Sequence, residues 1–264
     1  MFKYLFAKNE DIPAGAASLF FGFSSIFWFV VGTGLGSFNA AKLAFPDFVT
    51  GVEMFAFGHM RQVHVLAVIL GWISMAFGMT MMYMTPALGN CKLWSEKLGL
   101  WNCFIWNVGL SLGLILLWMG ITSGREYSDL IWPIDLVIIA TVLLPLCINV
   151  WMTIAQRRTQ GIYITNWFFG ACTFMVTVTF IVGQSPELFN LTGLTEAYMT
   201  FWFAHNLLGL WITPVAAGIA YYTIPKLTGN ALYSHRIGHL HFWSIIAFYS
   251  TPASHHLMSA PLPE

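Results

Sequence analysis

Long apolar segments recur along the whole chain, and they constrain its fold more than any other feature of the sequence. About twenty consecutive apolar residues cross the hydrocarbon core of a bilayer as a helix. Seven segments of about this length are separated here by short polar stretches. We therefore expect an all-α, polytopic transmembrane helix bundle of about seven helices. The expected spans are 15–38, 57–85, 98–122, 132–156, 165–184, 199–224 and 237–258.

The composition excludes an ordinary water-soluble domain. Charged residues make up 8% of the 264 residues and hydrophobic residues 58%, whereas about a quarter of a soluble domain is charged. The formal net charge is zero, which gives no support for nucleic-acid binding, because that function requires a basic patch. We expect residues 1–264 to form a single transmembrane domain in the lipid bilayer.

Lysine and arginine residues predict the orientation, because cytoplasmic loops are enriched in them. With a cytoplasmic N-terminus, eight of the 11 lie on the inner side, and only Lys42, Arg61 and Arg125 lie on the outer side. The N-terminal stretch shows no cleavable signal peptide. The four cysteines lack paired spacing and are interpreted as free apolar fillers rather than as a disulfide or metal set.

Histidines from three expected helices lie at a similar depth. His64 lies about seven residues into the second span, roughly 10 Å along the helix, and His205 lies at a similar depth in the sixth. His255 and His256 come near the outer end of the seventh. Ionisable groups inside spans are costly, and they usually face the bundle interior or bind something. We expect the four imidazoles to converge in the outer part of the bilayer.

His205, His255 and His256 offer a set of three imidazoles that suits copper, zinc or iron. Adjacent helical residues point about 100° apart, so His255 and His256 can face one ion only at a loosened helix end. Pro252, just upstream, can supply that distortion. Without a carboxylate or thiolate in this layer, one coordination position stays open, as is typical of a catalytic metal.

Simpler interpretations stay open for the single residues. A lone histidine in a transmembrane helix is often a hydrogen-bonded packing residue, and this applies to His64. His59, His235 and His239 are expected to be interfacial or solvated. Tyr249, deeper on the seventh span, needs a partner if buried, but periodicity alone favours an aromatic packing residue.

Five segments resemble the catalytic subunit of haem–copper oxidases, and most closely the cbb-type cytochrome c oxidases. The resemblance runs from about residue 15 to the last residue, and its C-terminal segment is the most specific. There His241, Tyr249, His255 and His256 all stand where the family pattern places them. The segments are FGHMRQVH, GREYSDLIWPID, IYITNWFFGA, WFAHNLLGLW and HFWSIIAFYSTPASHHLMSAPLP.

The resemblance implies a role for each histidine. His64 is similar to an axial ligand of the low-spin haem b. His205, His255 and His256 are similar to the three ligands of the active-site copper. Tyr249 resembles the tyrosine that is covalently linked to the first copper histidine, here His205, and that delivers a proton and an electron to bound oxygen.

Two charged residues also match the family pattern or its geometry. Glu126 resembles the acidic residue near a calcium ion that bridges haem propionates. Arg61 lies one turn from His64 on the outer side, and we expect it to pair with a propionate there.

The resemblance further implies a terminal respiratory oxidase of the bacterial inner membrane. Membrane-anchored c-type cytochrome subunits would supply electrons, which pass through the low-spin haem to a high-spin haem b and the copper. O2 is reduced there to water, coupled to proton translocation. Protons would come from the cytoplasmic side. Candidates for that path are Ser244, Thr223, Tyr222 and Tyr233, although such hydroxyls also serve in helix packing.

One departure from the family pattern is expected to matter. The family's catalytic subunit continues with further helices, which carry the proximal ligand of the high-spin haem and the second ligand of the low-spin haem. This chain stops at APLPE. We therefore expect an incomplete haem–copper oxidase subunit I fold, with the remaining C-terminal helices as a partner. A fragment, a split subunit and a degenerate protein all stay open.

Three rival functions stay open as well. A nitric oxide reductase of the same superfamily has iron in place of copper, lacks the tyrosine and places glutamates near the metal. Tyr249, without a carboxylate nearby on the last two spans, favours the oxidase. The other rivals are a transporter or channel whose histidines relay protons, and a non-catalytic structural remnant.

Overall fold

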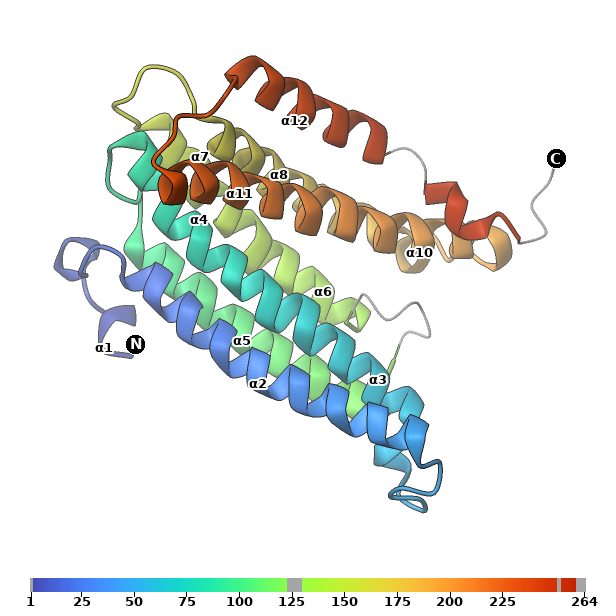
Figure 1. The fold of residues 1–264 in the computed structure, drawn as a ribbon. Helices are drawn as coiled ribbons and strands as arrows, with labels where there is room; N and C mark the ends of the chain where they lie inside the picture. The colour runs from blue at the N-terminus through green and yellow to red at the C-terminus, as the bar shows by residue number, and fades with distance from the viewer. Residues whose placement is uncertain (1, 123–129, 251–252, 260–264) are drawn as a thin grey trace.

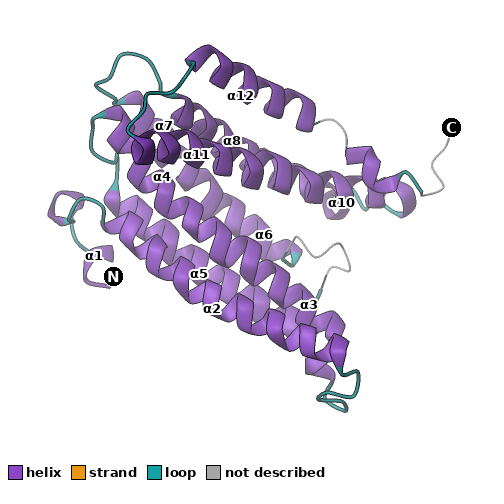
Figure 2. Ribbon diagram, in the orientation of Figure 1, coloured by secondary structure: helices purple, strands orange, loops and turns teal. Residues whose placement is uncertain are grey.

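The computed structural model describes residues 2–122, 130–250 and 253–259, and this part of the chain consists of helices joined by loops, without a strand (Figures 1 and 2). Six of its helical segments are long and apolar enough to cross a membrane. They are Ala16–Ala44, Phe57–Gly89, Glu96–Trp118, Trp132–Ala155, Ile164–Leu188 and Gly193–Thr228.

Several of these segments are built from more than one helical element. In chain order, all helical elements of the described residues are α1 (Phe2–Leu5), η1 (Asn9–Asp11), α2 (Ala16–Ala44), η2 (Glu53–Phe55), α3 (Phe57–Leu66), η3 (Ala67–Ile73), α4 (Ser74–Gly89), α5 (Glu96–Trp118), α6 (Trp132–Ile138), η4 (Ile139–Leu143), α7 (Leu144–Ala155), α8 (Ile164–Gly183), α9 (Ser185–Leu188), α10 (Gly193–Leu207), η5 (Leu208–Ile212), α11 (Thr213–Thr228), α12 (His235–Tyr249) and η6 (Ala253–Leu257).

Two spans extend six residues beyond a predicted boundary, and each extension has a local reason. α2 continues to Ala44 and ends where Phe45 leaves the helical region, at φ −130° and ψ 88°. Phe45 precedes Pro46, and a residue before proline disfavours the helical conformation. α10 begins at Gly193, six residues before the predicted 199, with Glu196 in its first turn. A carboxylate there stabilises the positive end of the helix dipole.

The seventh predicted span does not form one continuous α-helix. α12 has 15 residues, or about 22 Å, and is followed by the separate 3-10 helix η6, which carries His255 and His256. The predicted loosening of the helix before these histidines is therefore confirmed. Pro252, which was expected to cause it, lies outside the described residues.

Three π-helical segments, η3, η4 and η5, interrupt otherwise α-helical spans. The sequence did not predict them. Trp211 in η5 donates from Nε1 to Ser74 Oγ at 2.9 Å, which ties η5 to the junction between η3 and α4. π-Helical turns are rare and recur at functional sites, and η5 follows His205 by only a few residues.

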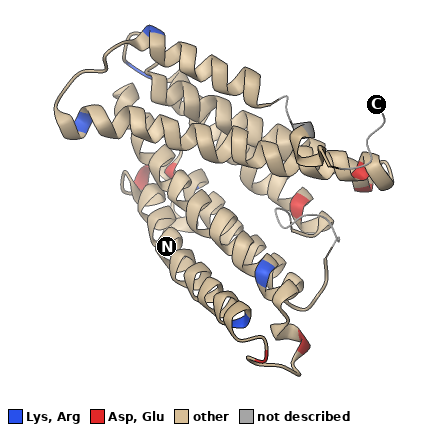
Figure 3. Ribbon diagram, turned by 45° about the vertical axis from the view of Figure 1, so that its right-hand side comes forward, with Lys and Arg blue, Asp and Glu red and all other residues tan. Residues whose placement is uncertain are grey.

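The charged residues lie mostly toward the ends of the helices (Figure 3). Inside the bundle, Glu96 at the start of α5 accepts from the backbone N–H groups of Gly15 at 2.7 Å and Ala17 at 2.9 Å, which satisfies the N-terminus of α2. α12 packs against α8 and η5, and η6 packs against α10. Figure 1 shows α12 at the border of the bundle. The four cysteines are free, as predicted.

Candidate metal centre

His205 is the buried member of the candidate centre, with only 3% of its surface exposed. It lies in the last turn of α10, just before the π-helical segment η5. Its Nε2 lies 2.9 Å from the backbone carbonyl oxygen of Tyr249, and its Nδ1 lies 3.1 Å from His256 Nε2. Because Nε2–H donates to the carbonyl, a neutral His205 imidazole presents Nδ1 as an acceptor toward the other histidines.

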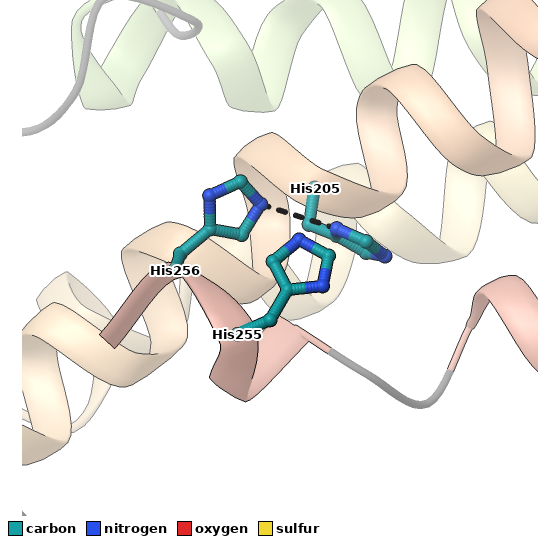
Figure 4. Close-up of side chains that lie close together, drawn as sticks. All are labelled: His205, His255 and His256. Atoms are coloured by element: carbon teal, nitrogen blue, oxygen red, sulfur yellow. Dashed lines mark hydrogen bonds between the residues drawn. The ribbon is translucent and has the colours of Figure 1, made fainter. Parts of the chain in front are cut away.

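His255 and His256 approach His205 from η6, and both side chains are exposed. One ligand nitrogen from each of the three histidines lies within 4.8 Å of the other two. The three imidazoles are turned toward one another (Figure 4), and the ring centroids of His205 and His255 are 4.7 Å apart. Phe201, one turn before His205 on α10, stacks on His256 with centroids 5.5 Å apart. The predicted triad is therefore assembled in one place.

The chemistry of this donor set fits copper or another imidazole-binding ion. Tetrahedral coordination at about 2.0 Å places ligand nitrogens about 3.3 Å apart, so a spread of up to 4.8 Å closes with small rotations of the side chains. The group contains no carboxylate or thiolate among the described residues. Three neutral ligands leave a fourth position open for a small molecule.

Tyr249 ends α12 and stacks its ring on His205, with centroids 4.5 Å apart and an interplanar angle of 23°. Gly209 in η5 makes this approach possible, because a β-carbon at that position would overlap the Tyr249 ring. The phenol is therefore held against the buried histidine of the triad, and a simple packing role in lipid does not explain this placement.

His64 occupies a second, separate site on α3. Its Nδ1 lies 2.8 Å from the carbonyl oxygen of Gly32 on α2. Gly36, one turn further along α2, leaves room for the ring, since a β-carbon there would lie 2.7 Å from His64 Cε1. Donation from Nδ1–H to a backbone carbonyl fixes the tautomer and leaves Nε2 as a metal ligand, which is the common arrangement of ligating histidines.

The other predicted site residues stand apart from the triad. Arg61 is exposed on α3, one turn before His64. Glu126 lies outside the described residues. His59 is half-buried, with Nδ1 3.2 Å from the carbonyl oxygen of Trp118.

Several residues that shape the site were not predicted. Gly36 and Gly209 carry no side chain and so leave room for the rings of His64 and Tyr249, whereas Gly32 accepts from His64 through its carbonyl oxygen. In the sequence, only the glycines of GTGLG in the first span could have indicated a close approach between helices. Tyr221 Oη lies 2.9 Å from His241 Nδ1. This pair connects α11 to α12 beside an apolar cavity of about 540 Å³ that Tyr233 also lines.

Comparisons with known proteins place these observations in context. The family model for cytochrome c and quinol oxidase polypeptide I matches residues 16–264. The Stutzerimonas stutzeri protein named Cbb3-type cytochrome c oxidase subunit CcoN1 is 33% identical over 251 residues, which cover 92% of this chain and 53% of the relative. The Agrobacterium tumefaciens (strain T37) protein named Cytochrome c oxidase subunit 1 homolog is 31% identical over 256 residues, covering 91% of this chain and 46% of the relative.

A third relative, from Bradyrhizobium diazoefficiens, is named Cytochrome c oxidase subunit 1 homolog, bacteroid. It is 29% identical over 263 residues, covering 93% of this chain and 46% of the relative. The chain thus spans about half the length of the curated relatives it matches, and it matches the N-terminal part of the first. The resemblance predicted from the sequence motifs is confirmed, and the six apolar helices make this a multi-pass membrane protein.

Proposed function

The chain belongs to the cytochrome c and quinol oxidase polypeptide I family, and we propose that it forms part of the catalytic subunit of a cbb-type terminal oxidase. In this proposal, membrane-anchored c-type cytochrome subunits supply electrons, O2 is reduced to water, and protons cross the bacterial inner membrane. One observation carries it: three imidazoles lie within 4.8 Å of one another, and a phenol is stacked on the buried one.

His205, His255 and His256 hold copper through their imidazole nitrogens. When bound, copper and a high-spin haem iron supply the binding of O2 and its one-electron reduction steps. His205 anchors the centre from the buried end of α10, and Phe201 limits the rotation of His256 by stacking on it. Tyr249 is placed to donate its phenolic proton and an electron beside His205.

His64 would hold the low-spin haem b through the Nε2 that its bond to Gly32 leaves open. Arg61 pairs with a haem propionate, and Glu126 binds calcium beside the propionates. The other ligands of the two haems would come from the remaining C-terminal helices of the catalytic subunit. The relatives' greater length supports this division.

Protons reach Tyr249 from the cytoplasmic side, on which the N-terminus also lies. His241 precedes Tyr249 by two turns of α12, roughly 12 Å, and its bond to Tyr221 offers one link of such a path. Ser244, one turn before Tyr249 on the same helix, is half-buried and can supply a further hydroxyl. Thr223, Tyr222 and Tyr233 stay candidates for the entry.

The test is a metal and activity analysis of the protein, purified in detergent with the polypeptides that co-purify. The proposal predicts copper, haem b and oxygen uptake with reduced cytochrome c, all copper being lost in His205→Ala. His239→Ala, which removes a histidine of α12 outside the triad, is the matched control and should retain copper. Non-haem iron in place of copper would instead support a nitric oxide reductase. Absence of haem would support a proton-conducting or non-catalytic membrane protein.

A further inference from the structure

Gly209 leaves less room for a side chain than any other glycine among the described residues. A β-carbon built at this position would overlap Cδ1 and Cε1 of the Tyr249 ring. Gly209 is buried and lies in the π-helical segment η5, against which α12 packs. The end of α12 therefore rests on bare backbone at this point.

A buried hydrogen bond fixes the segment around Gly209 on the side away from Tyr249. Trp211 is only 1% exposed and donates from Nε1 to Ser74 Oγ at 2.9 Å. Leu208, on the other side of Gly209, is 41% exposed and points away from the core. Because Trp211 ties η5 to the neighbouring span, η5 cannot retreat from Tyr249 without breaking a buried hydrogen bond. An added methyl group at Gly209 must therefore displace the Tyr249 ring.

Displacement of Tyr249 would reach the metal ligands by two routes. The Tyr249 ring stacks on His205, and the Tyr249 backbone carbonyl accepts from His205 Nε2 at 2.9 Å. In addition, η6 with His255 and His256 follows α12 in the chain. The position of one tyrosine thus sets both the orientation of His205 and the place from which the other two histidines approach.

We infer that Gly209 is a positioning residue for the three-histidine centre: its missing side chain seats Tyr249 against His205 and so holds the triad in register. The identity of the ion rests on the proposed function, but the packing of the Tyr249 ring on Gly209, called the seat below, does not. Glycine is needed here for the close approach of a ring to the helix backbone, a different requirement from a left-handed turn.

The experiment compares Gly209→Ala, Tyr249→Ala and the double variant in the protein purified with the polypeptides that co-purify. Copper retained against a chelator is expected to fall about ten- to a hundredfold in affinity in Gly209→Ala, as for loss of a residue that orients metal ligands. In the double variant the ring is absent, so affinity should return to within about twofold of Tyr249→Ala alone. Tyr249→Phe keeps the ring and should not rescue Gly209→Ala.

A second readout does not depend on metal. The unfolding temperature of the metal-free protein should fall in Gly209→Ala and recover when Tyr249 is also truncated. Gly34→Ala is the matched glycine control, because nothing lies within 4 Å of a β-carbon there. Leu208→Ala is the control within η5. Both should retain copper like the unaltered protein.

The outcomes separate the two proposals. Unaltered protein without copper contradicts the proposed function, and the unfolding temperatures then still decide on the seat. Unchanged copper affinity and unfolding temperature in Gly209→Ala would overturn the inference. So would a double variant with clearly lower affinity than Tyr249→Ala alone, because Gly209→Ala would then act through η5 itself and not through Tyr249.

Discussion

The three-histidine centre groups imidazoles from two elements, whereas the His64 site has a single imidazole. The triad collects imidazoles from α10 and η6, with ligand nitrogens within 4.8 Å of one another, so its donor set lies within the described chain. His64 stands as a single donor on α3, oriented by a backbone carbonyl and accommodated by a glycine of α2.

The two sites therefore depend on different contacts between helices. The triad depends on the meeting of two elements that are far apart in sequence, and it is sensitive to the placement of α12. The His64 ring is held by the packing of two neighbouring spans, α2 and α3, and it needs a second ligand from elsewhere to bind a haem on both faces. Copper retention should therefore depend on the contact between α10 and η6, and retention of the low-spin haem on the contact between α2 and α3.

The largest effect is expected from His205→Ala. It removes the buried member of the triad and both of its hydrogen bonds, to Tyr249 and His256. We expect copper to be lost from the purified protein while the low-spin haem spectrum remains. Metal analysis and optical spectra of the same sample check this. Loss of both signals together would show that the two sites are not independent.

His64→Ala should have the reverse effect on the two signals. The low-spin haem spectrum should disappear, and copper content should stay at the level of the unaltered protein. Electron entry would then fail, so oxygen uptake should fall by about a hundredfold, the upper end of the range seen even when only a residue that supports a metal ligand is removed. Retention of the low-spin haem would contradict the role given to His64.

A smaller effect is expected from Gly36→Ala. The new methyl group would lie against the His64 ring and must tilt it or push α3 away from α2. We expect about tenfold weaker haem retention and a shifted low-spin spectrum, with unchanged copper. Gly34→Ala on the same helix has no neighbour within 4 Å and should change neither signal.

Phe201→Ala should weaken the triad only slightly. The stacked pair with His256 contributes about 0.5–1.5 kcal/mol beyond its buried area, so copper affinity should fall about two- to tenfold. Competition with a chelator measures this. A loss of copper affinity as large as that of His205→Ala would mean that Phe201 positions the whole of η6 and not only the His256 ring.

The smallest effect concerns the opposite end of the helices. Cys91 follows α4 and should face the cytoplasm, away from both sites. Burial raises the pKa of the Cys91 thiol, and Arg158 partly offsets this. Little thiolate is therefore present at neutral pH, and labelling by a membrane-impermeant maleimide should speed up as pH rises. It should occur only from the cytoplasmic side, and Cys91→Ser is the control. Labelling from the outside would reverse the proposed orientation.

The sequence predicted the parts of this molecule that depend on composition and spacing. Apolar length alone located the six spans and also predicted a seventh over 237–258, which the structure forms as α12 and η6 instead of one long helix. The cost of buried imidazole pointed to four histidines, of which His205, His255 and His256 come together while His64 lies at a separate site. Pro252 indicated that the last helix would loosen before its histidines. The extensions of α2 and α10 were missed because polar residues such as Lys42 and Glu196 also fit within helix ends.

The remaining features could not be predicted because they depend on contacts between spans. The π-helical segments leave no periodic signal in the sequence, so it could not be derived that Gly209 lies against the ring of Tyr249. The seat of His64 requires the register of α2 against α3, which places Gly32 and Gly36 opposite the ring. Stacking of Tyr249 on His205 likewise depends on where α12 meets η5.

The central claim is that His205, His255 and His256 bind one copper ion together. X-ray absorption at the copper edge, on the purified protein and on His256→Ala, tests it most directly. We expect one copper per chain with three imidazole ligands, and two imidazole ligands or no copper in the variant. A copper-free protein, or a copper environment that His256→Ala leaves unchanged, would contradict it.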